Sequence, residues 1–479
     1  MTSSDSAFIT EPPRGRLARV ATRSAAWSEK WFPNTLVFAL LTVAVVAVAA
    51  LGIGSSPAKV ATVFGDGFWD LIPFTMQMAM VAIGGYVVAT AGPVRKGITR
   101  LARVPGNPRA AIAMVAAVSL LSALLNWGFS LIFSALLVRR LAERHDLRMD
   151  YRAASAAAYL GLGGSWALGL SSSAAQLQAN PASIPKSLLP VTGVIPFRET
   201  IFTWQSLLLA AVVVVVCVIV AFLTAPRASA ARTAADLGID PRDPVEDDTP
   251  RSRPGEWLEY SPLLTIVVVA LVGGWAVQEF AGNDPIVAIS GLNTYNLLFL
   301  TLGLLLHWRP RRFLSAVTKA VPATGGVLIQ FPFYAGIAAI MTKATDSAGT
   351  SISHHLAALF TSAGNDTTFP LLIGVYSVVL GFVIPSGGGK WIIEAPYVMQ
   401  AANDAHVNLG WTVQIYNASE ALPNLINPFW MLPLLGVLSL KARDIVGYTF
   451  VYLIALFPIV LGLLTLLSAT LPYHPPVLP

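Results

Sequence analysis

Long stretches without a charged residue alternate with short basic segments along this chain of 479 residues. Clear examples of such uncharged stretches are residues 31–58, 110–138, 200–226 and 320–342. Each is longer than the roughly 20 apolar residues that an α-helix needs to cross the hydrocarbon core of a bilayer. The pattern therefore predicts an all-α integral membrane protein with several spans, in which one membrane domain uses nearly the whole chain.

The composition supports a membrane protein and argues against a soluble one. Apolar residues make up 55% of the chain and charged residues 12%, whereas a soluble domain carries about 25% charged residues. The net charge of +6 does not indicate nucleic-acid binding, because the basic residues fall almost entirely between the apolar runs. The single cysteine, Cys217, excludes an intrachain disulfide and a cysteine metal site.

The basic residues also predict the orientation of the spans. The basic start, residues 1–30, lacks the short apolar core and cleavage site of a signal peptide and is expected to be a cytoplasmic tail. The positive-inside rule then places 26 of the 31 basic residues in the cytoplasm. The five exceptions are Lys59, Lys186, Arg198, Lys343 and Lys390.

Two basic loops flank the uncharged stretch 110–138, with Arg109 before it and Arg139 and Arg140 after it. As one straight helix this stretch would be about 44 Å long, against a hydrocarbon core of about 30 Å. A single crossing would also place one basic loop outside. We therefore expect a re-entrant hairpin that turns near Asn126 and returns to the cytoplasm; a long tilted helix is the alternative.

A second hairpin is expected at residues 367–402, where the polar run from Ser386 to Trp391 separates two apolar arms of similar length. The linker 226–259 carries many charges and prolines and suits a flexible cytoplasmic connection. The predicted organisation is thus a tail at 1–30, a first membrane repeat at 31–225, the linker at 226–259, a second membrane repeat at 260–472, and a C-terminal tail at 473–479.

Each repeat contains a hairpin followed by a broken helix, which is interrupted by polar residues, Gly or Pro. The first hairpin starts inside and the second outside, so we expect a helical bundle of two inverted repeats, each with a re-entrant hairpin and a broken helix. Such repeats are typical of secondary transporters, whose substrates bind where the repeats meet. Irregular backbone at membrane depth must be buried or line a polar cavity. The four interruptions are therefore expected to converge on one site; they are Asn126 to Gly128, Gly169 to Ser173, Ser386 to Trp391 and Pro423 to Pro428.

Three segments resemble a known family: Val383 to Trp391, Asn417 to Trp430, and Leu124 to Ser130. They are similar to the AtoE-type short-chain fatty acid transporters, from about Trp31 to the final helix. The resemblance implies a symporter for butyrate-like or acetoacetate-like monocarboxylates in the bacterial cytoplasmic (inner) membrane. It also implies an elevator-type mechanism with a moving transport domain and a scaffold, and a homodimer.

A short-chain carboxylate needs an anion site and a small apolar pocket. Exposed N–H groups of the glycine run at the start of a half-helix can bind the anion, and Lys390 adds a positive charge. An intramembrane lysine is a functional candidate by default, although Glu394, one turn further on, could instead pair with it structurally. The candidate substrate-binding residues are Ser386, Gly387, Gly388, Gly389, Lys390, Trp391, Asn126, Trp127, Ser171, Ser172, Ser173, Asn424 and Asn427, with Trp166 as a further wall of the tail pocket.

No cofactor or resident metal is expected, but an ion is expected to couple transport to a gradient. Glu420 and Glu394 are the candidate proton carriers, with Asn417 as a further coupling residue. A sodium site built from backbone carbonyls and Asn side chains is the competing interpretation.

The remaining function classes fit the sequence less well. The six histidines form no metalloenzyme spacing, so an enzyme is not expected. A carrier of another organic anion, such as a hydroxy acid or a dicarboxylate, and a passive anion channel are the alternatives. The expected partners are a small carboxylate and the lipid bilayer.

Overall fold

The computed structural model describes residues 35–186, 188–226, 231–242, 253–364, 367–384, 386–427 and 430–478. The expected tail 1–30 and parts of the linker lie outside these residues. Within them, the regular elements are helices, joined by turns and two isolated β-bridges. The fold class predicted from the sequence, an all-α membrane protein, is confirmed.

The helices of the first half of the chain include both arms of the first expected hairpin. Its helices are α2 (Thr35–Gly52), α3 (Pro57–Gly67), α4 (Ile72–Thr90), α5 (Gly92–Leu101), α6 (Pro108–Leu125), α7 (Trp127–Ala142), α8 (Tyr151–Leu160), α9 (Ser173–Ala179), α10 (Leu189–Thr192) and α11 (Trp204–Thr224). Helices α6 and α7 pack against each other and are joined only by Asn126. The chain is thus interrupted at Asn126, between helices of 18 and 16 residues; whether the pair is re-entrant stays a prediction.

The second half of the chain contains helices that correspond in order to several of the first half. Its helices are α12 (Trp257–Tyr260), α13 (Leu263–Gly282), α14 (Pro285–Ser290), α15 (Leu292–His307), α16 (Pro310–Ala320), α17 (Gly325–Lys343), α18 (Ile352–Ala363), α19 (Phe369–Val383), α20 (Gly387–Asp404), α21 (Leu409–Asn424), α22 (Leu432–Leu438) and α23 (Ala442–Ser468). In each half, a pair of helices (α6 and α7, α19 and α20) precedes an interrupted helix (α8 to α9, α21 to α22) and a long apolar helix (α11, α23).

Side-chain caps set many of the helix boundaries. Asn107 Oδ1 accepts a hydrogen bond from Ala110 N at 2.9 Å and begins α6, and Asp150 Oδ1 accepts from Ala153 N at 2.9 Å and begins α8. Such caps satisfy N–H groups that have no acceptor within the helix. The basic clusters that the sequence indicated as loops form the short helices α5 and α16, each with Pro in its first turn.

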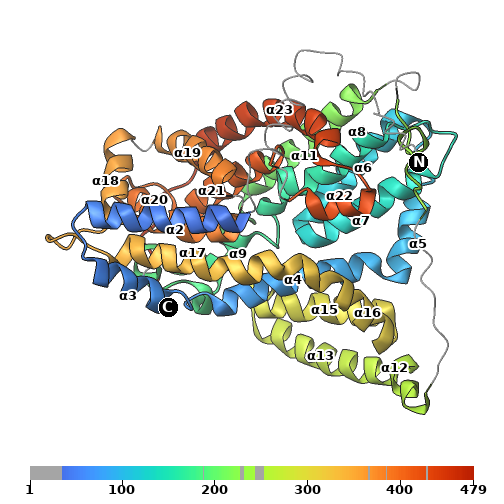
Figure 1. Cartoon of the computed structure of the whole chain (residues 1–479), viewed down its shortest axis with the longest axis horizontal. Coiled ribbons are helices and arrows are strands. Elements are labelled where there is room, and N and C mark those ends of the chain that lie inside the picture. The colour runs from blue at the N-terminus through green and yellow to red at the C-terminus, as the bar shows by residue number, and fades with distance from the viewer. Residues whose placement is uncertain are drawn as a thin grey trace, which may run out of the picture.

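Six helices in the described part of the chain are long and apolar enough to cross a membrane: residues 72–90, 108–125, 204–224, 254–282, 325–343 and 442–468. Helix α17 runs through the middle of the molecule between α4 and α20, whereas α13 lies at its edge with most of its side chains exposed (Figure 1). Apolar side chains such as Leu271 and Val277 of α13 are 69% and 70% exposed. A bilayer would cover such a surface, as expected for a multi-pass membrane protein.

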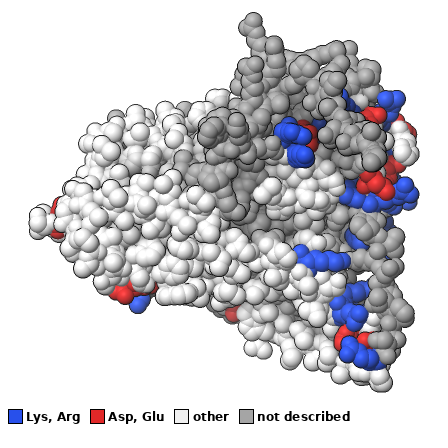
Figure 2. Space-filling model, viewed as in Figure 1, with Lys and Arg blue, Asp and Glu red and all other residues white. Residues whose placement is uncertain are grey.

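The charged side chains mark one end of the molecule. In the view of Figure 2, Lys and Arg gather at the end where Figure 1 shows α5 and α12, and the opposite end carries few charges. Helix α18 lies at that opposite end (Figure 1). The distribution is the one that the positive-inside rule gives for a cytoplasmic face at the basic end.

Part of the linker is docked rather than extended away from the helices. The Arg139 guanidinium, near the end of α7, donates to the main-chain carbonyls of Asp240, Pro241 and Arg242 and, at 2.7 Å, to that of Val437. Asp150, at the start of α8, accepts from Arg232 N at 2.9 Å. Residues 231–242 therefore bind to α7 and to the start of α8.

Candidate functional site

The tip of the first helical pair is built around Asn126. Its Oδ1 accepts from Phe129 N at 2.9 Å and so begins α7. Its Nδ2 donates to Val81 O of α4 at 3.2 Å and to Tyr295 Oη of α15 at 2.9 Å. All the polar atoms of this amide are occupied by protein, so Asn126 anchors the tip to α4 and α15.

The interruption in the first half is longer than the sequence indicated. Helix α8 ends at Leu160, and the chain continues through a π-helical turn, Gly161–Ser165, and a 3₁₀ turn, Trp166–Leu168, before α9 begins. Glycine at position 161 permits close packing against α6, since an added Cβ would lie 2.5 Å from Ser119 O. The run Gly161-Leu162-Gly163-Gly164 was the sequence signal for this earlier break.

Three adjacent serines follow this interruption and serve different purposes. Ser171 Oγ accepts from Trp127 N at 3.0 Å and holds the break against the tip of the first helical pair. Ser172 Oγ caps α9 and donates to Asn417 Oδ1 at 3.1 Å. Ser173 Oγ lies 3.5 Å from Met78 Sδ. Only Ser173 of the three lines the cavity described below.

The tip of the second helical pair places a helix N-terminus in the centre of the molecule. Ser386 Oγ accepts from Gly389 N at 3.3 Å, and its main-chain oxygen accepts from Lys390 N at 2.7 Å. The N–H groups of Gly387 and Gly388 occupy the first helical positions and have no acceptor within the helix. A Cβ added at Gly387 would lie 2.3 Å from Trp166 Cη2, so glycine is required for this close approach.

The interruption in the second half begins at Asn424, the last residue of α21. Tyr159 Oη donates to the main-chain oxygen of Asn424 at 3.0 Å and joins this break to α8. The Asn424 side-chain Nδ2 lies 3.5 Å from Leu162 O. Trp430 follows the break and packs edge-on against Trp127, with ring centroids 5.7 Å apart.

All four interruptions border one cavity, which is partly open to solvent. The lining residues are Met78, Trp127, Leu162, Trp166, Ser173, Val327, Phe331, Ser386, Gly387, Gly388, Asn424 and Trp430. Most of this wall is apolar, and its polar groups come from the interruptions.

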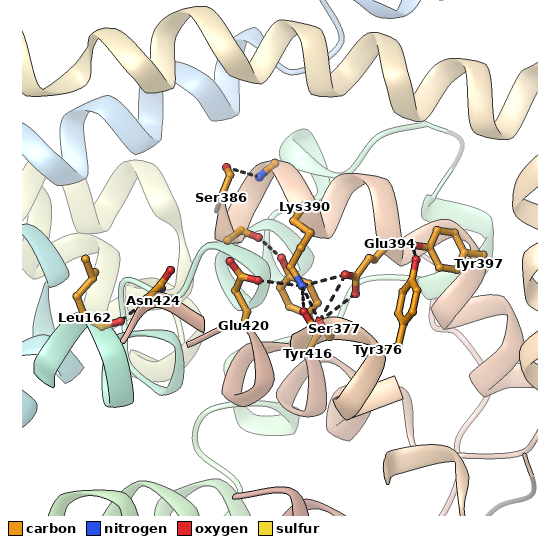
Figure 3. Close-up of polar contacts among 12 residues, drawn as sticks. Leu162, Tyr376, Ser377, Ser386, Lys390, Glu394, Tyr397, Tyr416, Glu420 and Asn424 are labelled. Atoms are coloured by element: carbon orange, nitrogen blue, oxygen red, sulfur yellow. Dashed lines mark hydrogen bonds and ion pairs between the residues drawn. The ribbon is translucent and has the colours of Figure 1, made fainter. Parts of the chain in front are cut away.

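A buried charge cluster lies about one turn further along α20, and its residues do not line the cavity. Lys390 Nζ lies 2.8 Å from both Glu394 Oε1 and Glu420 Oε2, and donates to Ser377 Oγ at 2.6 Å and Ser377 O at 2.9 Å (Figure 3). The three charged side chains are at most 1% exposed. The ammonium also lies 4.4 Å from the centre of the Tyr416 ring. One lysine thus faces two carboxylates, which gives the cluster a formal charge of −1 when all three groups are ionised.

The structure separates the sequence-predicted residues into two groups. Trp127, Trp166, Ser173, Ser386, Gly387, Gly388 and Asn424 line the cavity. The others, which are Asn126, Ser171, Ser172, Gly389, Lys390, Trp391, Asn417, Asn427, Glu394 and Glu420, lie outside its wall. Asn417 Oδ1 accepts from Ser172, and its Nδ2 donates to Gln414 at 2.7 Å, so both polar ends of this amide are paired.

Three residues of α4 and α17 that line the cavity were not predicted from the sequence: Met78, Val327 and Phe331. These residues lie in apolar helices where nothing distinguishes a cavity-facing position from a lipid-facing one. Trp430 and Leu162 could have been found, because each is next to an interruption. Among the described residues, His, Cys, Asp and Glu form no group of three or more that could hold a metal ion.

Comparison with known proteins relates the sequence to transporters. A family model described as "Short chain fatty acid transporter" matches residues 16–467. A protein of Escherichia coli (strain K12), provisionally named a short-chain fatty acid transporter, is 32% identical over 91% of this chain and 95% of its own. A protein of Haemophilus influenzae with the same provisional name is 30% identical over 93% of this chain and 99% of its own.

Two solved transporter structures have a similar fold. The YdaH transporter of Alcanivorax borkumensis superposes with a TM-score of 0.60 and 15% identity, covering 92% of this chain and 100% of its own. MtrF of Neisseria gonorrhoeae, described as belonging to a class of antimetabolite efflux pumps, superposes with a TM-score of 0.57 and 14% identity, covering 96% and 100%. At these identities the likeness concerns the fold alone.

Proposed function

Since the chain belongs to the short chain fatty acid transporter family, we propose that it is a secondary active transporter that takes up butyrate-like monocarboxylates across the cytoplasmic membrane. The observation that carries this proposal is the meeting of four helix interruptions on one small cavity. The transporter family, the multi-pass fold and a cavity bordered by four helix interruptions together favour a carrier over an enzyme.

The carboxylate of the substrate is proposed to bind at the N-terminus of α20. The N–H groups of Gly387 and Gly388 are available there, the helix dipole favours an anion, and Ser386 lies beside them on the cavity wall. The Trp166 indole N–H is buried, has no partner in the described part of the chain, and is a further donor on this wall. The acyl chain would then lie against apolar side chains, where each buried methylene contributes about 0.8 kcal/mol.

Lys390 is assigned a different role from the one its position in the motif suggested. Its ammonium contacts Ser377, Glu394 and Glu420 and does not border the cavity. A direct bond to the substrate would require these contacts to break. We therefore place Lys390 in the ion-coupling machinery and leave binding of the anion to the α20 N-terminus.

Coupling to protons is favoured over coupling to sodium. A buried net charge is costly in a membrane protein, and one proton bound to Glu394 or Glu420 would neutralise the cluster around Lys390. Asn417, a candidate sodium ligand, already uses both polar ends of its amide within the protein. Proton binding at this cluster, which begins about one turn beyond the substrate-binding end of α20, would couple the two ligands.

The proposed movement is of the elevator type. The transport domain would contain the two helical pairs and the interrupted helices, and the scaffold would contain α2 to α5 and α13 to α17. In Figure 1 the first and second helical pairs belong to regions that extend toward opposite ends of the molecule, which supports an inverted relation of the repeats. A homodimer would form through the scaffold, whose helix α13 has a largely exposed apolar surface.

The test is uptake of labelled butyrate by proteoliposomes, with proton and sodium gradients applied separately. The expected result is saturable accumulation against a butyrate gradient, driven by an inward proton gradient. Unlabelled acids of two to six carbons, lactate and succinate serve as competitors, and the short monocarboxylates should compete best. Uptake that never exceeds equilibrium would indicate a channel, and strongest competition by succinate would indicate a dicarboxylate carrier.

A further inference from the structure

Two buried polar atoms belong to residues on the cavity wall and have no hydrogen-bond partner among the residues that the structure describes: Trp166 Nε1 and Asn424 Oδ1. The two side chains are only 6% and 1% exposed. An unpaired polar atom in such a place is costly unless a ligand or water pairs with it. The two atoms differ in kind, because the indole N–H can only donate and the amide oxygen can only accept.

The carboxylate site proposed above can pair with Trp166 but not with Asn424. A carboxylate and a keto group offer only acceptor oxygens, which repel another acceptor. An unsubstituted acyl chain offers no donor at all. Butyrate and acetoacetate would each leave Asn424 Oδ1 unpaired when they displace water from the cavity.

The orientation of the Asn424 amide is determined by its neighbours. The group 3.5 Å from Asn424 Nδ2 is the main-chain oxygen of Leu162, which only accepts. Rotating the amide by half a turn would place two acceptor oxygens against each other. Figure 3 shows Asn424 Oδ1 directed away from Leu162. The end of α21 is held by the bond from Tyr159 Oη to the Asn424 main-chain oxygen.

We propose that Asn424 Oδ1 accepts a hydrogen bond from a substrate hydroxyl group, so that the cavity prefers a hydroxy-substituted short-chain monocarboxylate to the unsubstituted acid and to the keto acid. This inference rests on the proposed function and specifies its substrate class. The carboxylate binds at the N-terminus of α20 and at Trp166, and the hydroxyl binds at the end of α21.

The preferred substrate carries its hydroxyl group on a carbon that is not bonded to the carboxylate carbon. Asn424 is contributed by α21 and the anion-binding N–H groups by α20, and an acceptor oxygen directly beside the carboxylate would repel it. A 2-hydroxy acid also donates readily to its own carboxylate, which removes the donor that Asn424 requires. The preferred class is therefore the 3-hydroxy or 4-hydroxy acid of about four carbons, such as 3-hydroxybutyrate.

The experiment is competition in proteoliposomes that contain the full chain. Labelled butyrate uptake is measured against unlabelled 3-hydroxybutyrate, 2-hydroxybutyrate, acetoacetate and butyrate, and labelled 3-hydroxybutyrate uptake is measured in parallel. For the unmodified protein, 3-hydroxybutyrate should inhibit at roughly three- to ten-fold lower concentration than butyrate, the effect of one net hydrogen bond. Acetoacetate should be no better than butyrate.

Two variants make the comparison specific. Asn424→Leu keeps the volume and removes the acceptor, so the ratio of inhibition constants should fall to about one. Thr412→Val is the matched control, because Thr412 lies in the same helix, is buried and bonds only within it, to Asn408 O at 2.9 Å. This variant should retain the ratio of the unmodified protein. Ratios within one preparation do not depend on how much protein folds.

Each result has a distinct meaning. Butyrate uptake with no preference for 3-hydroxybutyrate would overturn this inference and leave the proposed function standing. Uptake of 3-hydroxybutyrate without butyrate would support the inference and narrow the proposed function, and uptake of neither would overturn both. If Asn424→Leu changed the sodium dependence but not the ratio, Asn424 would be a cation ligand and the inference would be wrong.

Discussion

Replacing Lys390 by methionine tests whether this residue balances two carboxylates or binds the substrate. The change removes the only cation of the buried cluster and leaves Glu394 and Glu420 facing each other, so the formal charge falls from −1 to −2. Their oxygens each lie 2.8 Å from the same nitrogen, so they are at most about 5.6 Å apart. Two unit charges at that distance repel by roughly 3 kcal/mol at an effective dielectric constant of about 20.

The expected loss of stability is therefore large. Removing one partner of a buried ion pair typically costs roughly 3–5 kcal/mol, in agreement with the repulsion estimated from the distances. Lys390→Met should lower the melting temperature of the purified protein in detergent by several degrees. Glu394→Gln, which takes the cluster to a formal charge of zero, should lower it far less.

The triple variant Lys390→Met, Glu394→Gln, Glu420→Gln removes all three charges while keeping similar volumes. It should recover most of the stability that Lys390→Met loses, because no unpaired charge remains, but it should not accumulate substrate against a gradient. The assay is the intrinsic tryptophan fluorescence during heating, followed by reconstituted exchange and accumulation. Unchanged melting of Lys390→Met together with a complete loss of butyrate binding would refute this reasoning and return Lys390 to the substrate site.

Three further changes test other parts of the account. Glu420→Gln should impair proton-driven accumulation more than equilibrium exchange of labelled butyrate, and equal loss of both would indicate a structural role. Gly387→Ala should abolish uptake while the protein remains inserted, because the added Cβ would lie 2.3 Å from a carbon of the Trp166 indole. Gly436→Ala is the control and should transport normally, because a Cβ added there meets nothing within 4 Å. Single cysteines at Arg109 and Arg140, in a chain whose native cysteine is replaced by serine, should react with an impermeant thiol reagent from the same side, whereas opposite sidedness would exclude a re-entrant first hairpin.

The sequence was most informative where a polar residue interrupts an apolar run. Asn126 and Ser386 begin α7 and α20 through caps that their short side chains make locally, so the turns could be predicted from neighbouring residues alone. The break after Leu160 was expected eight residues too late, since the π-helical turn there depends on close packing against α6 and not on a local cap.

Contacts between distant segments could not be predicted in the same way. The sequence offered a pair between Lys390 and Glu394 as the alternative to substrate binding, and this pair is present. The second carboxylate, Glu420, comes from another helix. The contribution of Met78 and Phe331 to the cavity depends on how α4 and α17 pack, which an apolar sequence does not specify. The docking of residues 231–242 likewise depends on Arg139 and Asp150, which lie far from the linker in the sequence.

The central claim is that a short carboxylate binds in the cavity where the four interruptions meet, and substrate protection of a cysteine at Ser173 tests it most directly. Ser173 lines this cavity, so in a Cys217→Ser background the Ser173→Cys thiol should react more slowly with a small thiol reagent when butyrate is present. Ser362→Cys, on an exposed part of α18, should react at the same rate with and without butyrate. Butyrate should protect position 173 and succinate should not. An unchanged reaction rate at saturating butyrate, in protein that still transports butyrate, would contradict binding in this cavity.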